Sequence, residues 1–129
     1  MGLTDHSLPL LADAMIGGTP FELPDTLYLK LCVTEPTAST AGTDSGIDPV
    51  ETDMTTEWEL SESDIPTNLG TLDHGDAPAT VPGVQWVELW DTADDSGNRW
   101  LYGELDQAYT ITAGTPVSFE PGTISIPLA

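Results

Sequence analysis

The sequence predicts a mainly β protein, an antiparallel β-sandwich with a short N-terminal α-helix, and three observations support this fold class. The stretch from Val84 to Leu105 places two apolar, aromatic-rich segments on either side of a polar run, residues 91–98, as a β-hairpin does. Short strand-like segments with glycine and proline turns follow it at regular spacing, which is typical of antiparallel sandwiches. Near the N-terminus, apolar residues recur with the period of a helix. The length of 129 residues suits a single domain, residues 1–129.

The helix is expected over residues 7–18. Ser7 is placed to cap its first turn, and Pro9 falls within that turn, where a missing N–H costs little. Gly17 and Gly18 end it. A helix of about three turns is not stable alone, so its apolar stripe must pack on the sheet or on a neighbouring subunit. That stripe consists of Leu8, Leu11, Ala12 and Met15.

Strands are expected wherever apolar residues alternate with others. The first runs from Thr26 to Thr34, with Cys32 as a small buried residue and Lys30 as a solvated or paired surface group. A short strand, 55–60, is anchored by Trp58, whereas residues 35–47 and 67–83 are expected to be loops. Three further strands are expected after the hairpin: Ala108–Thr112, one around Val117 and Phe119, and one carrying Ile124, Ile126 and Leu128.

The two faces of the first hairpin strand differ in composition. Val87 and Leu89 share an apolar face that should point into the core. Trp86, Glu88 and Trp90 share the other face, which is expected to meet a subunit contact or the helix, because a carboxylate cannot lie unpaired in a dry core.

Arg99 directly follows the turn of the hairpin and is the single arginine of the chain. It is expected to pair with Asp91 or Glu88 across the ribbon. An exposed pair of this kind contributes only about 0–1 kcal/mol, so replacing Arg99 should barely affect stability.

The charge balance is extreme: 22 acidic residues against two basic ones give a formal net charge of −20. The acids are spread through a chain that is 39% hydrophobic, which excludes a disordered acidic tail. The near absence of lysine indicates a halophilic protein, since molar salt screens repulsion between carboxylates. With two cations to offer, the chain is not expected to bind nucleic acid or an anionic membrane surface. It shows neither a signal peptide nor an apolar stretch long enough to span a membrane.

Candidate chemical sites are few. His6 and His74 lack neighbours at metal-ligand spacing and are expected to be exposed polar residues. The hairpin turn is expected to be a solvated turn, because Asp and Asn are common in turns. The alternative is that its oxygen ligands surround a cation, although it lacks the spacing of a calcium-binding loop. Neither a cofactor nor catalysis is expected, because no convergent set of catalytic groups is visible. The oxygen-bearing turn residues are Asp91, Asp94, Asp95 and Asn98.

Several motifs resemble a known family. A helix ends in Gly17-Gly18-Thr19, and a Pro-Asp-Thr-Leu-Tyr-Leu strand, residues 24–29, leads into Thr-Glu-Pro-Thr, residues 34–37. Later come Val84–Asp91, Gly97-Asn98, Leu101-Tyr102-Gly103 and Thr112–Val117. This order resembles small virion proteins of tailed phages, the tail fibre or head fibre proteins. Residues 35–80 match poorly, and Glu88 stands where relatives often have a small residue.

The resemblance implies a non-enzymatic virion protein, and the acidic composition adds a haloarchaeal tailed virus as its source. The protein is expected to form a threefold or fivefold ring of its own copies and to contact other virion proteins. This homo-oligomer would belong to a capsid vertex spike or turret or to a tail fibre or baseplate, and would contribute to host attachment. The interface residues would be Leu8, Leu11, Met15, Trp86 and Trp90. The alternative is a cell-surface or carbohydrate-binding module of a halophile, with the aromatic residues as a sugar platform.

Overall fold

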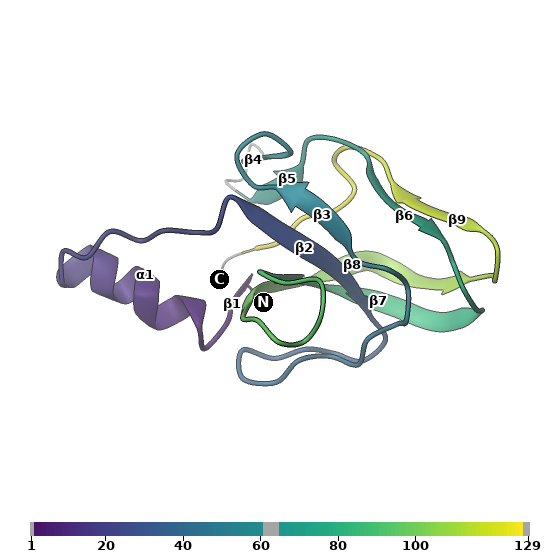
Figure 1. Ribbon diagram of the computed structural model, residues 1–129, viewed down its shortest axis with the longest axis horizontal. Coiled ribbons are helices and arrows are strands. Elements are labelled where there is room, and N and C mark those ends of the chain that lie inside the picture. Colours follow the sequence, from purple (N-terminus) through teal and green to yellow (C-terminus); the bar gives the residue numbers. More distant parts are fainter. Residues whose placement is uncertain (1, 61–64, 128–129) are drawn as a thin grey trace.

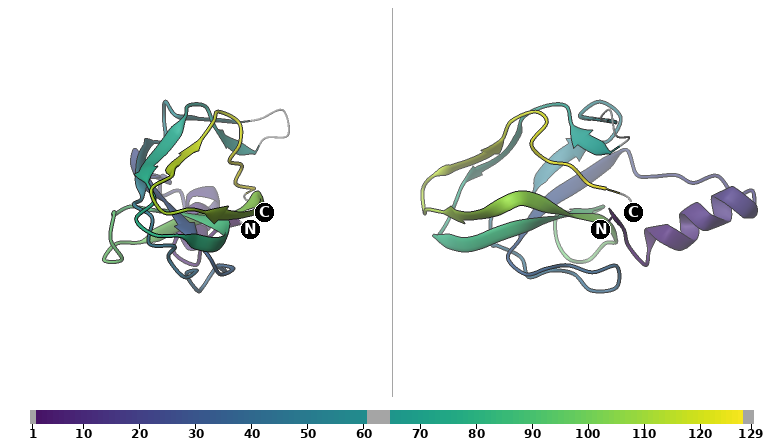
Figure 2. Two further views of the ribbon diagram at one scale, coloured as in Figure 1. Left: turned by 90° about the vertical axis from the view of Figure 1, so that its right-hand side faces the viewer. Right: turned by 180° about the vertical axis from the view of Figure 1, so that it is seen from behind.

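The computed structural model describes residues 2–60 and 65–127, and it confirms a mainly β fold with antiparallel sheets and one N-terminal helix. The largest sheet has five strands in the order β1-β8-β7-β2-β3. Strands β4 and β5 form one small sheet, and β6 and β9 form another. Seen end on, the three sheets surround a common interior, while helix α1 extends away from the strands (Figures 1 and 2). The elements are β1 Gly2–Leu3, α1 Ser7–Ile16, β2 Thr26–Cys32, β3 Val50–Asp53, β4 Trp58–Leu60, β5 Pro66–Asn68, β6 Leu72–Asp76, β7 Val81–Trp90, β8 Arg99–Ile111 and β9 Pro116–Phe119.

The predicted hairpin is present and lies at the centre of the large sheet. β7 is its middle strand and pairs with β8 on one side and with β2 on the other. Residues 91–98 connect β7 to β8, as expected. The apolar alternation of β2 also fits, since Leu27, Leu29 and Leu31 are fully buried. The core formed in this way is completed by Ile47, Trp58, Leu72, Val84, Val87, Leu89, Trp100, Leu101, Leu105, Val117, Ile124 and Ile126, among others.

The apolar face of β7 points into the core, as predicted, and Val87 and Leu89 are completely buried. We therefore expect Leu89→Ala to lower the free energy of unfolding by about 2–5 kcal/mol, the range for removing a leucine side chain from a packed core. Denaturant melts in molar salt measure this loss. The exposed Leu69, at 47% exposure, supplies the control, because Leu69→Ala should change stability far less. Equal losses for the two variants would contradict the assignment of the faces.

Strand β8 is longer than expected. The predicted separate strand Ala108–Thr112 is wrong, because β8 continues to Ile111 without a turn. Its pairs with β7 change register between Val84–Tyr109 and Trp86–Glu104, which leaves extra residues on β8. A bulge of this kind bends the strand and interrupts the apolar alternation, so the sequence suggests two strands where one exists.

The middle of the chain holds more strand than the sequence indicates. β3 was not anticipated, and the predicted loop 67–83 is wrong, since it contains most of β5, all of β6 and the start of β7. β6 has the polar sequence Leu-Asp-His-Gly-Asp and pairs with β9 far along the chain, so its pairing is a long-range effect. Residues 35–47 carry only an isolated bridge between Asp44 and Cys32, in keeping with a loop.

The C-terminal segment packs in the core without forming the strand that was predicted. Ile124 and Ile126 are buried, as their alternation suggests, but the segment has a single bridge, from Ser125 to Thr67. It lies over Gly103, where an added Cβ would meet an Ile126 side-chain carbon at 3.3 Å. The absence of a side chain at Gly103 thus makes room for it. Leu128 lies outside the described residues.

Candidate functional site

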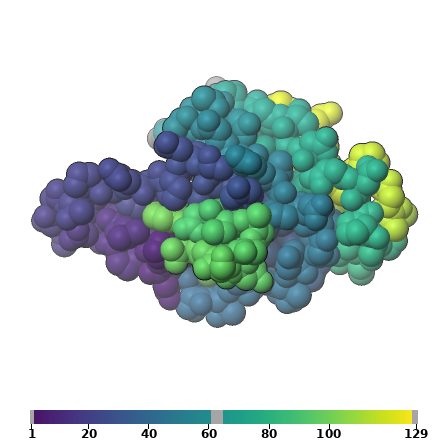
Figure 3. Space-filling view, in the orientation of Figure 1, coloured from purple at the N-terminus to yellow at the C-terminus, as the bar shows by residue number. Residues whose placement is uncertain are grey.

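Helix α1 is the most exposed apolar element of the described structure. It projects from one end of the molecule, and the linker 17–25 returns alongside it to β2 (Figures 1 and 3). Met15 is 78% exposed and Ile16 is 90% exposed. Soluble surfaces rarely gather large apolar side chains in this way unless the patch meets a partner. The exposed large apolar residues of α1 are Leu8, Leu10, Met15 and Ile16.

The base of α1 is fixed to β8 by hydrogen bonds. The buried Ser7 hydroxyl donates to the Trp100 carbonyl at 2.7 Å, and the Thr4 hydroxyl donates to the Arg99 carbonyl at 2.6 Å. The prediction that Ser7 caps the helix is therefore wrong: His6 occupies the cap position without a side-chain bond, because Ser7 is the first helical residue and its hydroxyl is used by β8. At the other end, Gly18 has φ +78°, a backbone conformation that favours glycine after a helix.

An apolar groove of about 320 Å³ lies where α1 and the linker leave the body of the protein. Leu11, Phe21 and Leu23 line it from the projection, and Trp58 and Leu60 line it from the body. The other lining residues are Leu3, Ser7, Met54, Glu59, Pro66 and Leu101. The alternation of Phe21 and Leu23 in the proline-flanked linker is the available sequence signal for this groove.

The structure places the five expected interface residues in two separate regions. Leu8, Leu11 and Met15 are together on α1, with Leu11 half-buried at the groove. Trp86 and Trp90 are half-buried on the outer face of β7. Both sets retain apolar surface for a contact, but they do not form one continuous patch with the groove.

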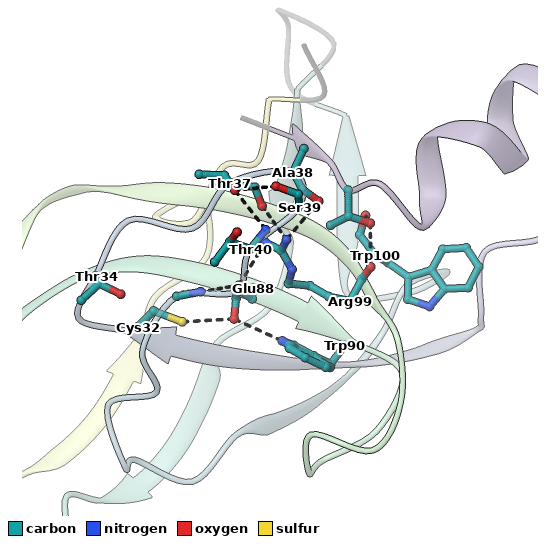
Figure 4. A network of polar contacts seen from close by, with 12 residues as sticks. Cys32, Thr34, Thr37, Ala38, Ser39, Thr40, Glu88, Trp90, Arg99 and Trp100 are labelled. Carbon is teal, nitrogen blue, oxygen red and sulfur yellow. Dashed lines mark hydrogen bonds and ion pairs between the residues drawn. The ribbon is translucent and has the colours of Figure 1, made fainter.

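The outer face of β7 is covered by the chain itself at its centre. Glu88, only 2% exposed, lies under the segment 37–42, and the Gly42 amide donates to its Oε2 at 3.1 Å. On the same face, Trp90 Nε1 and the Cys32 thiol donate to Oε1 at 3.2 and 3.3 Å. The expectation that a subunit contact or the helix covers this carboxylate is wrong, because an internal loop does so (Figure 4).

Arg99 pairs with Glu88, one of the two predicted partners, but the pair is buried rather than exposed. Arg99 Nη1 donates to Glu88 Oε2 at 3.1 Å, and the two side chains are 7% and 3% exposed. Arg99 Nη2 also donates to the carbonyls of Thr37 and Ala38, so the guanidinium ties the loop to the sheet. The expected small effect of Arg99 on stability assumed an exposed pair, and it does not apply to this buried pair.

Cys32 is buried, as predicted, and its thiol is one of the hydrogen-bond donors to the Glu88 carboxylate. Burial raises the pKa of the Cys32 thiol, and the neighbouring Glu88 carboxylate raises it further. A thiol that stays protonated can keep donating to Glu88 Oε1 and is a poor nucleophile.

Lys30 is buried as well, contrary to its expected surface position. Its ammonium group lies 4.2 Å from the centre of the Trp90 ring, donates to the Asp94 carbonyl and approaches Asp95 Oδ1 at 3.4 Å. The alkyl stem crosses the sheet surface while the charge reaches the hairpin turn. A protein cation thus contacts the turn for which a metal ion was the alternative to a solvated turn.

The remaining carboxylates of the turn accept hydrogen bonds from the turn itself. Asp91 accepts from the Asn98 amide at 2.7 Å and from Trp100 Nε1 at 3.2 Å. Hydrogen bonds from Ser96 lower the pKa of Asp94. Across residues 2–60 and 65–127, no group of three or more His, Cys, Asp or Glu side chains is arranged to hold a metal ion.

The two histidines have different surroundings. His6 is exposed, as predicted, and its ring meets the Trp100 ring edge-on at 4.7 Å. His74 is only 5% exposed, so that prediction is wrong: Nδ1 lies 2.9 Å from the Asp48 carbonyl, and the ring packs edge-on against Phe119. Nε2 has no hydrogen-bond partner among the described residues. Its position on the inner face of β6, which is not visible as a strand in the sequence, explains the difference.

Burial lowers the pKa of His74, and this predicts a pH dependence of stability. The unfolded chain binds a proton near pH 6.5, whereas the folded protein resists protonation until a lower pH. The stability contributed by neutral His74 is therefore complete above about pH 6.5 and is lost as the pH falls through the lower folded pKa.

The measurement is the free energy of unfolding at pH 7.5 and 5.5 in molar salt, for the wild type and for His74→Asn. Asparagine can still donate to the Asp48 carbonyl, but it does not titrate. We expect the wild type to lose more stability between the two pH values than the variant does, because only the wild type has His74 to protonate. The carboxylates are the same in both proteins, so their contribution cancels in the difference. Identical slopes would show that His74 does not carry the effect.

Comparison with known proteins completes this description. The family model described as Podophage GP4 fiber I protein gp80 matches residues 2–127. The match includes residues 35–80, where the sequence motifs were weakest. A search of the curated proteins found no match. Within the residues that the structure describes, no helix is long and apolar enough to cross a membrane.

Proposed function

This chain belongs to the Podophage GP4 fiber I protein gp80 family, which places it in the virion, and we propose that it is a self-assembling, non-enzymatic fibre subunit of a tailed virus adapted to high salt. The observation that carries the proposal is the family match over residues 2–127, nearly the whole chain of 129 residues. The structural elements on which the resemblance rested, the N-terminal helix and the long hairpin, are both present.

Self-assembly is supported by the projecting helix. Fibres and spikes are built from repeated copies, and closed cyclic symmetry limits their growth. The apolar residues of α1 are uncovered in the single chain, and burying them against another copy would remove apolar area from water. A ring of three or five copies, with α1 nearer the end that attaches to the particle, would cover these residues and leave the opposite end of the strands outward.

Adaptation to high salt is supported by the position of the two basic residues. Lys30 and Arg99 are 5% and 8% exposed, so the surface of the protein presents carboxylates and neither a lysine nor an arginine side chain. Such a surface repels itself in dilute buffer and is screened in molar salt. A haloarchaeal host fits this surface.

The same family membership supports a position at the tail of the particle. A family described as a fibre protein favours a tail fibre or baseplate over a turret at a capsid vertex. The outward end of a fibre is then the part that would meet the host surface.

The carbohydrate-binding alternative receives no support from the aromatic residues. Trp58 and Trp100 are core residues, and the ammonium group of Lys30 lies over the Trp90 ring. All nine Trp, Tyr and Phe side chains lie in the described part of the chain and are buried or half-buried, so they do not present an open platform for a sugar ring.

The test is mass spectrometry of virus particles purified in molar salt, combined with gold-labelled antibodies raised against this chain. We expect the protein in many copies per particle and gold at the tail. Gold at capsid vertices would favour the turret position instead. Absence of the protein from purified particles, while it accumulates in infected cells, would refute a virion role.

A further inference from the structure

Two unpaired apolar surfaces lie at the same end of the molecule. One is α1, whose tip carries the exposed Met15 and Ile16, and the other is the apolar groove at its base. Leu60, on the rim of this groove, is 64% exposed. Among the described residues, only Leu69 is a further large apolar side chain with comparable exposure. Apart from Leu69, the exposed large apolar side chains of the described residues are therefore concentrated at one end.

The groove cannot be filled by the tip of its own helix. Leu11 already lines the groove from the base of α1. A helix rises about 1.5 Å per residue, so Ile16 lies roughly 7 Å farther along the axis, away from the body. The projection in Figures 1 and 3 shows this direction. Among the described residues, therefore, none of α1 beyond Leu11 reaches the groove, and Met15 and the groove are both open to a contact with another molecule.

Charge selects the occupant. Molar salt screens repulsion between exposed carboxylates but does not remove the cost of burying an unpaired carboxylate in a contact, so two copies of a chain with 22 acidic residues should meet through surfaces that carry few of them. Helix α1 has a single acidic residue, Asp13, and among the residues that the structure describes Glu59 is the one acidic residue that lines the groove. These two surfaces are therefore compatible with each other, whereas most other pairings would bring carboxylates together. Both surfaces are also apolar, so the contact gains from the removal of water.

We propose that the tip of α1 from one copy inserts Met15 and Ile16 into the apolar groove of the next copy. The contact is head-to-tail, because helix and groove are different surfaces, and such contacts form a ring when the rotation closes. This inference rests on the proposed self-assembly and specifies the surfaces that produce it. The groove volume of about 320 Å³ is at the lower end of ordinary binding pockets, of the order of 300–1,000 Å³, and suits a few side chains rather than a whole domain.

The test uses two variants that each lack one half of the contact. The helix variant carries Met15→Glu and Ile16→Glu, and the groove variant carries Leu60→Glu. All three positions are more than 60% exposed, so the substitutions should leave the fold intact. Near-UV circular dichroism of the buried tryptophans verifies this. Leu69→Glu is the control for the groove variant, because it adds one charge outside the groove. Leu69→Glu with Thr71→Glu is the control for the helix variant, because it adds two charges at exposed positions outside α1.

Sedimentation in molar salt provides the measurement. The wild type and both controls should form the same closed oligomer, and each half-blocked variant alone should sediment as a monomer. An equimolar mixture of the two variants should form a heterodimer, since one intact helix meets one intact groove and no further contact is possible.

The outcomes separate the two levels of the proposal. A wild type that remains monomeric at about 100 µM overturns both the proposed self-assembly and this contact. If the wild type assembles while the groove variant assembles equally well, self-assembly stands and the contact is refuted. A mixture in which both variants stay monomeric also refutes it, because a symmetric helix-to-helix contact would not be restored by mixing.

Discussion

Replacing Arg99 with alanine is expected to lower the free energy of unfolding by about 3–5 kcal/mol, the range for breaking a buried ion pair by removing one partner. The variant leaves the Glu88 carboxylate, which is 2% exposed, without its counter-charge. It also leaves the carbonyls of Thr37 and Ala38 without the guanidinium that pairs them. An unsatisfied buried group incurs its full desolvation penalty, which is why the loss exceeds the value of the pair itself.

Two control variants separate burial from charge. Asp95→Asn removes the carboxylate of the second ion pair, but Asp95 is 86% exposed and its removal should change stability by less than about 1 kcal/mol. The double variant Arg99→Met with Glu88→Gln should lose less than the sum of the two single variants, because it removes the uncompensated charge. Denaturant melts in molar salt measure the wild type, Arg99→Ala, Asp95→Asn, the single variants Arg99→Met and Glu88→Gln, and the double variant. A loss for Arg99→Ala as small as that for Asp95→Asn would show that the buried pair is not needed for stability.

The surroundings of Arg99 and Glu88 also show which part of this fold could be predicted from the sequence. The alternation in β7 assigned Val87 and Leu89 to the core correctly, because burial of every second residue leaves a pattern. The burial of Glu88 has no corresponding pattern in the sequence. Its cover comes from residues 37–42, whose small side chains carry no apolar signal and whose contribution is made by backbone amides and carbonyls.

The errors in the middle of the chain have a similar origin. β6 reads as a loop because Asp73, Gly75 and Asp76 are polar or flexible, and the strand exists only through pairing with β9. His74 was predicted to be exposed for the same reason: its burial depends on β6, a strand that the local sequence does not indicate. Local patterns therefore predicted the hairpin and the core strand β2, and long-range pairing decided the rest.

The candidate site was predictable on the helix and unpredictable in the groove. The stripe that includes Leu8, Leu11 and Met15 identified α1 as an element in need of cover, and the structure leaves Leu8 and Met15 exposed. The groove combines residues from the linker, β4 and β8, which are far apart in the sequence. Its existence follows from how these segments meet, and no single stretch encodes it.

The second large effect is expected from salt. Lowering the salt concentration from molar to about 10 mM should unfold the isolated subunit cooperatively, because the Debye length grows from about 3 Å to about 30 Å. At 30 Å, carboxylates across the whole surface repel one another, and the formal charge of −20 is unopposed. The two cations cannot relieve this repulsion at the surface, since Lys30 and Arg99 are buried and already paired.

The helix variant Met15→Glu with Ile16→Glu is the suitable protein for this measurement if it is monomeric, because dissociation of an oligomer would otherwise overlap with unfolding. Near-UV circular dichroism reports on Trp58 and Trp100, which are buried in the core. Titration with a neutral osmolyte at 10 mM salt serves as the control. The osmolyte favours burial of surface without screening charge, so it should restore the tryptophan signal to a smaller extent than an equal concentration of salt does. A tryptophan signal unchanged from molar salt to 10 mM would contradict the argument, because it would mean that the packed core outweighs the repulsion of an unscreened acidic surface.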